Sequence, residues 1–199
     1  MTIDEAAIER LVEEARAGDA WAFGRLFDHY HLPVYRYIAS RIHRPADAED
    51  LTQLVFVKAL EALPRYESRG IPFGGWLFRL ARNTVIDHVR TRHEHADLDA
   101  VIGHAGREAG PDEVTIARQE MDEVAVAMAT LTDEQRDAIS LRFFAGLSAR
   151  EAAEVMGNQE GTVRGLQFRG IAALRRQLGI DADDLTGGGN AANEGRRNR

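Results

Sequence analysis

Hydrophobic residues recur at spacings of three and four positions along most of the 199-residue chain, and no stretch shows the alternation of a half-buried strand. This spacing predicts amphipathic helices that each bury one face. We therefore expect an all-α fold of two small helical domains joined by a flexible linker. The expected bounds are 1–95 for the first domain, 96–112 for the linker, 113–180 for the second domain and 181–199 for a disordered tail.

The first two helices have recognisable start and stop signals. Thr2 and Glu5 have the spacing of a capping box, and Gly18 ends the hydrophobic stripe that follows them. Asp19 is placed to cap a second, longer helix. Pro33 lies inside that helix and has no amide hydrogen, so we expect a kink or a break there.

Two more helices complete the first domain. Asp47 is expected to cap the third helix, which continues to about Leu63. A loop rich in glycine and proline follows over 64–75, and the fourth helix begins between 73 and 76. It is expected to end at about His93, where the helical spacing of large hydrophobic residues stops.

The second domain begins after a stretch with few large hydrophobic residues, 94–111, which is typical of a linker. Helical spacing returns over 114–128. Thr132 and Gln135 then have capping-box spacing for a further helix, which is expected to end at Gly146.

The segment 147–178 predicts a helix-turn-helix. Ser148 and Glu151 have capping-box spacing, Gly157 is expected to end the first helix, and a second helix begins near Glu160. In a helix-turn-helix the second helix enters the major groove of DNA. An ordinary helical hairpin with a solvated basic face is the alternative. The basic residues of the second helix are Arg164, Arg169, Arg175 and Arg176.

Composition limits the possible classes of function. The formal net charge of −7 argues against a protein that coats nucleic acid, so any DNA contact requires local basic faces. The chain has no cysteine, which excludes disulfides and cysteine-ligated zinc. The acidic N-terminus does not resemble a signal peptide, and no apolar run approaches the roughly 20 residues that span a bilayer. We expect a soluble, cytoplasmic protein without direct membrane insertion.

The helix expected over 47–63 has two hydrophobic residues within its polar arc. At about 100° per residue, Leu54 and Val57 fall among acidic and amide side chains rather than on the core side. Such an arc is typical of a protein-docking face, although two scattered surface hydrophobics need no special explanation. The core side is expected to contain Leu51, Val55, Phe56, Ala59, Leu60, Ala62 and Leu63.

The helix over 76–92 carries a tryptophan and an amide among arginines. Such a face offers base stacking, hydrogen bonds to base edges and phosphate neutralisation together. A core tryptophan beside solvated arginines is the alternative. The residues that recur on this face are Trp76, Arg79, Asn83, Asp87 and Arg90.

Three ordered motifs resemble those of a known family. They are DAEDLTQLVFVKAL (47–60), YESRGIPFGGWLFRLARNTVIDHVR (66–90) and LSAREAAEVMGNQEGTVRGLQFRGIAALRRQL (147–178). They resemble regions 2.2, 2.3–2.4 and 4.2 of the extracytoplasmic-function (ECF) sigma factors, the smallest class of the sigma-70 superfamily. The resemblance implies a factor that binds core RNA polymerase and directs promoter-specific transcription initiation. It would do so through recognition of the −10 and −35 elements and DNA melting.

The resemblance also implies roles for residues of the first domain. In the family, the helix matching 47–63 docks on the clamp helices of the polymerase β′ subunit, and the segment matching 66–92 opens the −10 element. Asn83 would lie near the pocket for a flipped-out base, Phe73 would form its wall, and Trp76 would lie beside the duplex edge. The implied polymerase contacts are Asp47, Asp50, Gln53, Leu54 and Val57. The implied phosphate contacts are Arg79, Arg82, Arg90 and Arg92.

By resemblance, the second domain recognises the −35 element. Early residues of a recognition helix usually meet base edges and later ones meet phosphates. The family often has serine and arginine where this chain has Gly165 and Leu166, and a glycine there removes a base-reading donor. The residues assigned to the groove are Gly161, Thr162, Arg164 and Gly165. Those assigned to phosphates are Arg169 and Arg176.

The implied partners are core RNA polymerase, through its β′ clamp helices and β flap, promoter DNA, and an anti-sigma factor. A one-component DNA-binding regulator is an alternative, but it leaves the two unusual helix faces of the first domain without a role. An enzyme is a third class. No phosphate-binding glycine loop or nucleophile elbow is present, so we expect no catalytic residue, metal site or cofactor.

Overall fold

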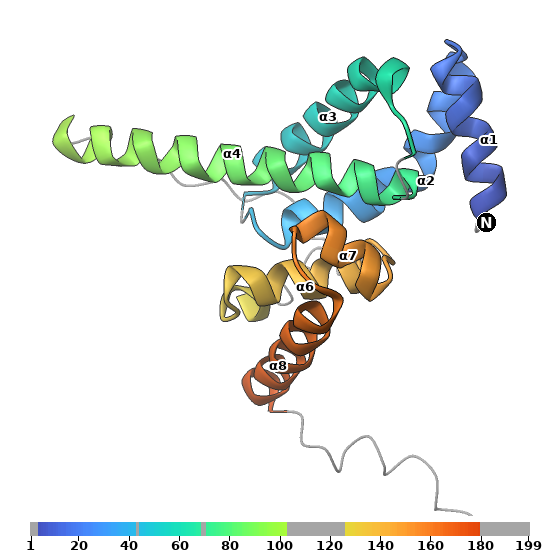
Figure 1. Cartoon of the computed structure of the whole chain (residues 1–199). Coiled ribbons are helices and arrows are strands. Elements are labelled where there is room, and N and C mark those ends of the chain that lie inside the picture. The colour runs from blue at the N-terminus through green and yellow to red at the C-terminus, as the bar shows by residue number, and fades with distance from the viewer. Residues whose placement is uncertain (1–3, 43, 69–70, 103–125, 180–199) are drawn as a thin grey trace, which may run out of the picture.

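The computed structural model describes residues 4–42, 44–68, 71–102 and 126–179, of which 93–102 are described by their backbone alone. Within these ranges the regular structure is helical and contains no strand, as predicted (Figure 1). The predicted tail, the linker beyond 102 and most of the predicted helix over 114–128 lie outside the described residues. The helices are α1 (Glu5–Arg16), α2 (Ala20–Ala39), α3 (Pro45–Ala62), the short 3₁₀ helix η1 (Leu63–Arg65), α4 (Phe73–Ile102), α6 (Asp133–Phe143), α7 (Ala149–Met156) and α8 (Glu160–Leu178).

Three predicted helix starts are confirmed by their hydrogen bonds. The Asp19 side chain accepts from two backbone amides at the start of α2. Thr132 and Ser148 each form a complete capping box, before α6 and α7 respectively. Gly157 ends α7 in the left-handed conformation, with φ of 67°, as predicted. These signals act within one helical turn, which is why the sequence alone was sufficient to identify them.

Two predicted caps were wrong. Asp4, rather than Thr2, caps α1, because its carboxylate accepts from the backbone amide of Ala7. Arg44 rather than Asp47 precedes α3, since Pro45 occupies the first helical position, where its missing amide hydrogen costs nothing. Asp47 lies in the first turn instead, where its negative charge interacts favourably with the positive end of the helix dipole.

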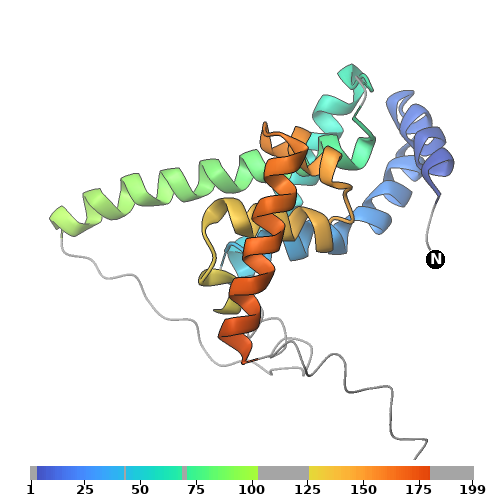
Figure 2. The same ribbon diagram turned by 60° about the horizontal axis from the view of Figure 1, so that its bottom comes forward.

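One predicted helix end was also wrong, and the break that was one of two possibilities at Pro33 is absent. The helix α2 is continuous through Pro33, because buried Tyr30 and Val34 anchor it on both sides of the lost hydrogen bond, so the alternative of a kink stays a prediction. The helix α4 continues past His93 to Ile102, into the segment expected as linker. The segment 94–102 contains no glycine or proline, so no local signal interrupts the helix there. The C-terminal part of α4 therefore extends beyond the other helices (Figures 1 and 2).

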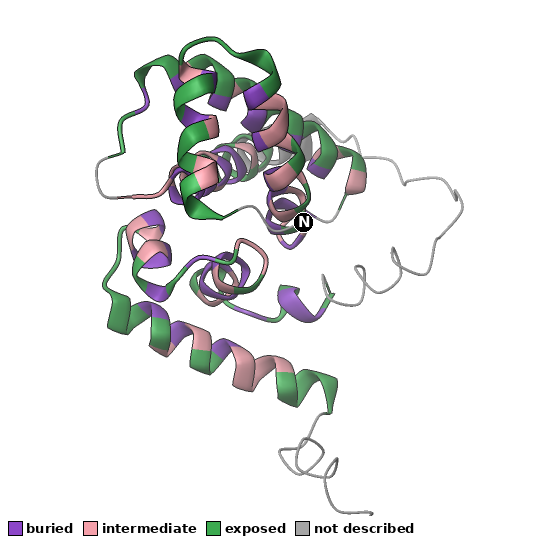
Figure 3. Cartoon of the chain, turned by 90° about the vertical axis from the view of Figure 1, so that its right-hand side faces the viewer, coloured by how far each residue is buried: buried purple, intermediate pink, exposed green. Residues whose placement is uncertain are grey.

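The helices form two units that pack against each other. The N-terminal unit contains α1 to α4, and the C-terminal unit contains residues 126–179 with α6, α7 and α8. Buried residues line the sides of the helices that face one another, while exposed residues cover the outer sides (Figure 3). One hydrophobic core includes residues of both units, because α7 packs on α4 and α6 packs on α2. A smaller cluster around Met128, Leu131 and Ile139 joins the start of the C-terminal unit to α8.

Candidate functional site

The outward side of α3 carries a row of exposed aliphatic side chains. Leu54 is 41% exposed and Val57 is 52% exposed, whereas the residues behind them are buried. Leu60 continues the row and is 53% exposed, although it was predicted to lie in the core. That prediction was wrong because Leu60 follows Val57 by three positions and therefore shares its face. The remaining predicted docking residues lie beside this row, the first half-buried and the others exposed: Asp47, Asp50 and Gln53.

Asp47 connects α3 to α4. Its carboxylate lies 3.7 Å from the Arg44 guanidinium and 3.5 Å from that of Arg92. Both arginines are largely exposed, so these ion pairs contribute little to stability. Arg92 is a predicted phosphate contact and Asp47 a predicted polymerase contact. The structure thus brings one residue of each predicted site into contact.

An aromatic cluster holds the start of α4. The Phe73 ring is buried, with its centroid 5.6 Å from that of Tyr30, 5.7 Å from that of Tyr66 and 5.3 Å from that of Trp76. A Cβ atom at Gly74 would lie 3.1 Å from the Tyr30 hydroxyl, so the helix start approaches α2 closely. Trp76 is half-buried at the edge of this cluster. The cluster therefore joins the start of α4 to α2 and to Tyr66.

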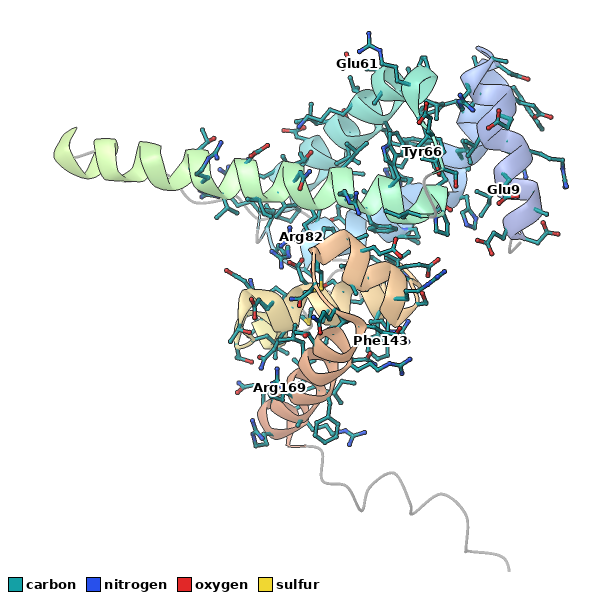
Figure 4. The ribbon with its side chains drawn as sticks, in the orientation of Figure 1. Glu9, Glu61, Tyr66, Arg82, Phe143 and Arg169 are labelled. Atoms are coloured by element: carbon teal, nitrogen blue, oxygen red, sulfur yellow. The ribbon has the colours of Figure 1, made fainter. Side chains whose placement is uncertain are left out.

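The predicted DNA contacts along α4 fall into two groups. Asn83, Arg90 and Arg92 are exposed. Arg79 and Arg82 are half-buried, because α7 of the C-terminal unit packs on α4 and Asp137 of α6 contacts Arg82. Figure 4 shows Arg82 at the junction between the two units.

Arg79 and Arg82 both donate hydrogen bonds to the C-terminal unit. The Arg79 Nη2 atom lies 2.8 Å from the Glu154 carbonyl oxygen in α7. The Arg82 Nε atom lies 3.0 Å from Oδ2 of Asp137 in α6. These contacts, and Asp137 itself, were not predicted from the sequence, because no local pattern relates residues 75 and 55 positions apart.

Asp137 is a buried carboxylate with three donors from the N-terminal unit. Besides Arg82, it accepts from the Tyr37 hydroxyl at 2.8 Å and pairs with Arg41 Nη2 at 2.7 Å. Burial raises the pKa of Tyr37 well above its ordinary value, and the neighbouring Asp137 charge adds to this. The phenol therefore remains a donor. Close by, the hydroxyl oxygens of two buried serines from the two units, Ser40 and Ser140, lie 2.9 Å apart.

The outward side of α8 is polar and basic. Val163 and Leu166 are buried and fix which side faces outward. Leu178 is 55% exposed, because it lies in the last turn, beyond the cluster that holds Ile171 and Leu174. All the predicted −35 contacts are exposed except the half-buried glycine at the centre: Gly161, Thr162, Arg164, Gly165, Arg169 and Arg176.

Two of the arginines on this side lie close to residues one turn earlier in α8. Arg164 Nη2 pairs with the Glu160 carboxylate one turn earlier, at 2.6 Å. The Arg169 guanidinium lies over Gly165, where a Cβ atom would be 3.3 Å from Nη1. Glycine at 165 therefore leaves room for the Arg169 side chain, which lies on α8 (Figure 4).

Two exposed aromatic residues of the C-terminal unit were not singled out by the sequence analysis. Phe143 at the end of α6 is 59% exposed, and Phe168 in α8 is 76% exposed. Phe168 follows Arg164 by four positions, so the helical spacing contained the signal that would have placed it on the outward side.

A cavity of about 560 Å³ lies where α1, α2 and the loop before α4 meet the turn between α6 and α7. Its lining includes the buried Tyr30 and the glutamates Glu5, Glu9, Glu13 and Glu151. Among the described residues, no group of three or more histidine and acidic side chains is arranged to hold a metal ion. None of the described helices is long and apolar enough to cross a membrane.

Comparisons with known proteins match both units. A family model for sigma-70 region 2 matches residues 26–94, and one for sigma-70 region 4 matches residues 127–176. The ECF RNA polymerase sigma factor BldN of Streptomyces coelicolor is 38% identical over 181 residues, which cover 90% of this chain and 69% of BldN.

Solved structures show the same architecture. CnrH, in complex with the cytosolic domain of CnrY, matches with a TM-score of 0.68 at 29% identity, over 88% of this chain and 99% of CnrH. The sigma factor RpoE from Bartonella quintana, in complex with the anti-sigma factor NepR, matches with a TM-score of 0.65 at 25% identity. That match covers 80% of this chain and 98% of RpoE.

Proposed function

The chain belongs to the ECF sigma factors of the sigma-70 family, and we propose that polymerase docking, −10 opening and −35 recognition are assigned to α3, α4 and α8 respectively. As a sigma factor it binds core RNA polymerase and promoter DNA and directs promoter-specific transcription initiation. In this assignment residues 1–95 form the docking and opening domain and 113–180 the −35 domain. Residues 96–112 connect them, and 181–199 form a tail.

The face of α3 is the proposed dock for the β′ clamp helices. Leu54, Val57 and Leu60 follow one another at three-residue intervals, and each is at least 41% exposed. Asp50 and Gln53 flank them with acceptors and a donor. A hydrophobic row with a polar border is the usual anatomy of a protein interface. Leu60 thereby joins the docking residues that the sequence analysis named.

The start and outward face of α4 are proposed to open the −10 element. Trp76, at the edge of the aromatic cluster, is available to stack beside the duplex edge, and Asn83 is exposed for contacts with a base. Arg90 and Arg92 are exposed for phosphates farther along the helix. Extruding a base costs a few kcal/mol of stacking, which a shaped protein pocket can offset without ATP. We therefore assign no catalysis to this chain.

The DNA-binding part of this proposal rests on the amphipathic character of α8, which has one buried apolar face and one exposed basic face. Buried Val163 and Leu166 hold it against the unit, so Thr162, Arg164 and Arg169 are presented outward. The docking geometry of a helix-turn-helix places such a face in the major groove. Because the base-reading side chains are few, we assign α8 mainly to positioning the complex through phosphates.

Run-off transcription with purified core polymerase tests the proposed function. The template is a promoter mapped by transcript analysis after overexpression of the protein. A product of defined length is expected only when core and this chain are both present. Absence of both a product and a core complex would refute the assignment.

A gel shift with and without core polymerase tests the alternative of a one-component regulator. We expect weak binding of promoter DNA by the free protein and tight binding by the complex with core. Tight operator binding by the free protein, unchanged when core is added, would favour the regulator instead.

An anti-sigma factor is the proposed regulator of this chain, acting in the cytoplasm, where core polymerase is found. The structures of RpoE with NepR and of CnrH with CnrY support this proposal, since both matched chains were solved with a bound partner. Co-purification from unstressed cells is expected to recover a second small protein. Recovery of core polymerase alone would count against this regulation.

A further inference from the structure

The cavity of about 560 Å³ is almost unused by the surfaces assigned above, since Phe73 is the one residue of its lining that carries a proposed DNA or polymerase role. One side of the cavity is formed by α1, α2 and the loop before α4. The other side is formed by the turn between α6 and α7 together with Glu151 of α7. Ligand sites in proteins have volumes of roughly 300–1,000 Å³. The cavity is therefore large enough to hold a small molecule.

The wall formed by α1 alternates carboxylates with aliphatic side chains. Glu5, Glu9 and Glu13 follow one another at four-residue intervals, and Ile8 and Val12 line the cavity between them. Residues four positions apart share a helix face and lie about 6 Å apart along the axis. The wall therefore repeats a negative charge about once per 6 Å, with apolar surface between the charges.

The negative charge of this wall is largely unbalanced. Glu13 pairs with Arg16 at 2.8 Å, but within the part of the chain that the structure describes neither Glu5 nor Glu9 forms an ion pair. The described lining includes no lysine or arginine, and burial lowers the pKa of its histidine, His29, which is therefore neutral near pH 7. A ligand that fills the cavity removes water from these carboxylates, so it must bring positive charge.

A buried hydroxyl lies across the cavity from α1. Tyr30 of α2 is only 9% exposed, and among the described residues its hydroxyl has no hydrogen-bond partner. Burial raises the pKa of Tyr30, and the nearby Tyr66, Glu5 and Glu151 add to this, so carboxylates from both units lie within electrostatic reach of the hydroxyl. Buried hydroxyls usually have a partner. The Tyr30 hydroxyl is therefore available to accept a hydrogen bond from a ligand.

We propose that the cavity binds a linear polyamine, a chain of methylene groups that carries an ammonium group every few carbons. The ammonium groups pair with Glu5 and Glu9 on one side and with Glu151 on the other, through charge-assisted hydrogen bonds. One of them also donates to the Tyr30 hydroxyl. The methylene groups pack against the aliphatic side chains of α1, so the ligand repeats the alternation of charge and apolar surface that the wall shows.

A single metal ion matches this wall less well than an extended cation does. The carboxylates of α1 are spread along the helix, and no cluster of three or more acidic or histidine side chains suited to a metal ion occurs in the described ranges. The aromatic rings of Tyr66 and Phe73 also line the cavity, and aromatic faces attract organic ammonium groups. Glu9 on α1 and Tyr66 after η1 lie on neighbouring parts of the molecule (Figure 4).

Isothermal titration calorimetry of the free, full-length protein with spermidine tests this site. At an ionic strength of about 0.15 M, which screens exposed charges beyond about 8 Å, we expect saturable binding of one spermidine per chain. Magnesium chloride at the same ionic strength is the control, and we expect no saturable binding of it. Absence of saturable spermidine binding would overturn the proposal. An equal response to magnesium would do so too, because it would show that the acidic surface attracts any cation. Neither core polymerase nor DNA is present, so the result is independent of the proposed function.

Two matched pairs of variants test the carboxylates. Glu9→Gln on α1 and Glu151→Gln on α7 are each expected to raise the Kd for spermidine about tenfold, because each removes one charge-assisted hydrogen bond. Glu14→Gln on α1 and Glu154→Gln on α7 are the controls, since they remove the same charge from the same helices outside the cavity lining. Glutamine at 151 can still complete the capping box of α7, so this variant keeps its helix start.

Tyr30→Phe tests the buried hydroxyl, because it keeps the aromatic ring and removes only the oxygen. We expect the Kd for spermidine to rise about threefold to tenfold. An unchanged Kd in Tyr30→Phe would mean that the ligand does not enter the cavity. Equal Kd values for the cavity variants and their controls would show that spermidine binds only to the general acidic surface, and would overturn the site.

Discussion

Tyr37 in α2 donates its hydroxyl hydrogen to Asp137 in α6 across 2.8 Å, although 100 residues separate the two in sequence. Both residues are buried, and the ion pair of Asp137 with Arg41 is equally short, at 2.7 Å. Among the described residues, all the partners of the Asp137 carboxylate belong to the other unit. These hydrogen bonds and ion pairs of Asp137 are therefore made only while the units are in contact.

Removal of these groups should destabilise the protein unequally. Tyr37→Phe removes one hydrogen bond to a charged group and should lower the free energy of unfolding by about 1.5–3 kcal/mol. Asp137→Ala leaves Arg41 without its buried counter-charge and should cost about 3–5 kcal/mol. Urea unfolding followed by circular dichroism measures both. The double variant should cost less than the sum, because the two changes remove a shared interaction; strict additivity would contradict the contact.

The aliphatic row on α3 should be required for binding to core polymerase. Leu54→Ser/Val57→Ser removes two exposed hydrophobic side chains, each worth about 1.5–3 kcal/mol when fully buried in an interface. We expect the Kd for core, measured by fluorescence anisotropy, to rise by about a hundredfold or more. The control is Leu32→Ser on α2, which removes a side chain that is 49% exposed outside this row. An equal rise for both variants would mean that general surface hydrophobicity, not the α3 face, drives binding.

Local signals were sufficient to predict most helices, but the contact between units was not predictable from them. The Thr132 and Ser148 caps depend on residues three positions apart, and the orientation of α8 follows from Val163 and Leu166. By contrast, Asp137 had no distinguishing neighbours in sequence. Its significance arises from Tyr37 and Arg41, which the packing of α2 on α6 brings to it, and from Arg82 of α4.

In the candidate sites, too, features set by local helical spacing were predictable and features set by contacts between the units were not. The exposed residues of α8 were predictable, because helical spacing alone decides which side faces outward. The partial burial of Arg79 and Arg82 was not, because it depends on α6 and α7, which are distant in sequence. The prediction that Leu60 lies in the core was avoidable, since its spacing from Val57 already indicated a shared face.

Arg164 and Arg169 should contribute differently to −35 binding. Arg169→Ala should weaken binding of the core complex to all sequences and reduce the slope of log K against log salt by about 0.9. Arg164→Ala should instead cost about 1–3 kcal/mol mainly at one base pair. Anisotropy titrations over a salt series, with single-base variants of the −35 element, measure both effects. The control is Arg36→Ala on α2, which removes the same charge from another surface. An equal change in the slope of log K against log salt for that variant would refute the assignment of Arg169 to a phosphate.

Gly157 should be required for the turn between α7 and α8. Its φ of 67° is left-handed, so Gly157→Ala should lower the free energy of unfolding by about 1–2 kcal/mol. Gly161→Ala is the matched control for stability, since a Cβ atom there meets nothing within 4 Å and alanine favours the helix. Thermal unfolding of the two variants should therefore move in opposite directions. A loss in both would indicate that the turn conformation is not the cause.

Alkaline pH should weaken the contact between Tyr37 and Asp137. Burial raises the pKa of Tyr37 in the folded protein above that of the unfolded chain, so the folded state keeps its proton while the unfolded state loses it. This contribution to stability is complete below about pH 10, the ordinary tyrosine value, and is lost as pH rises above it. The advantage of wild type over Tyr37→Phe should therefore shrink above pH 10, by up to about 1.4 kcal/mol per pH unit. Urea unfolding of both proteins from pH 8 to pH 11 measures this difference, and a constant advantage across that range would show that Tyr37 is not buried as a neutral donor.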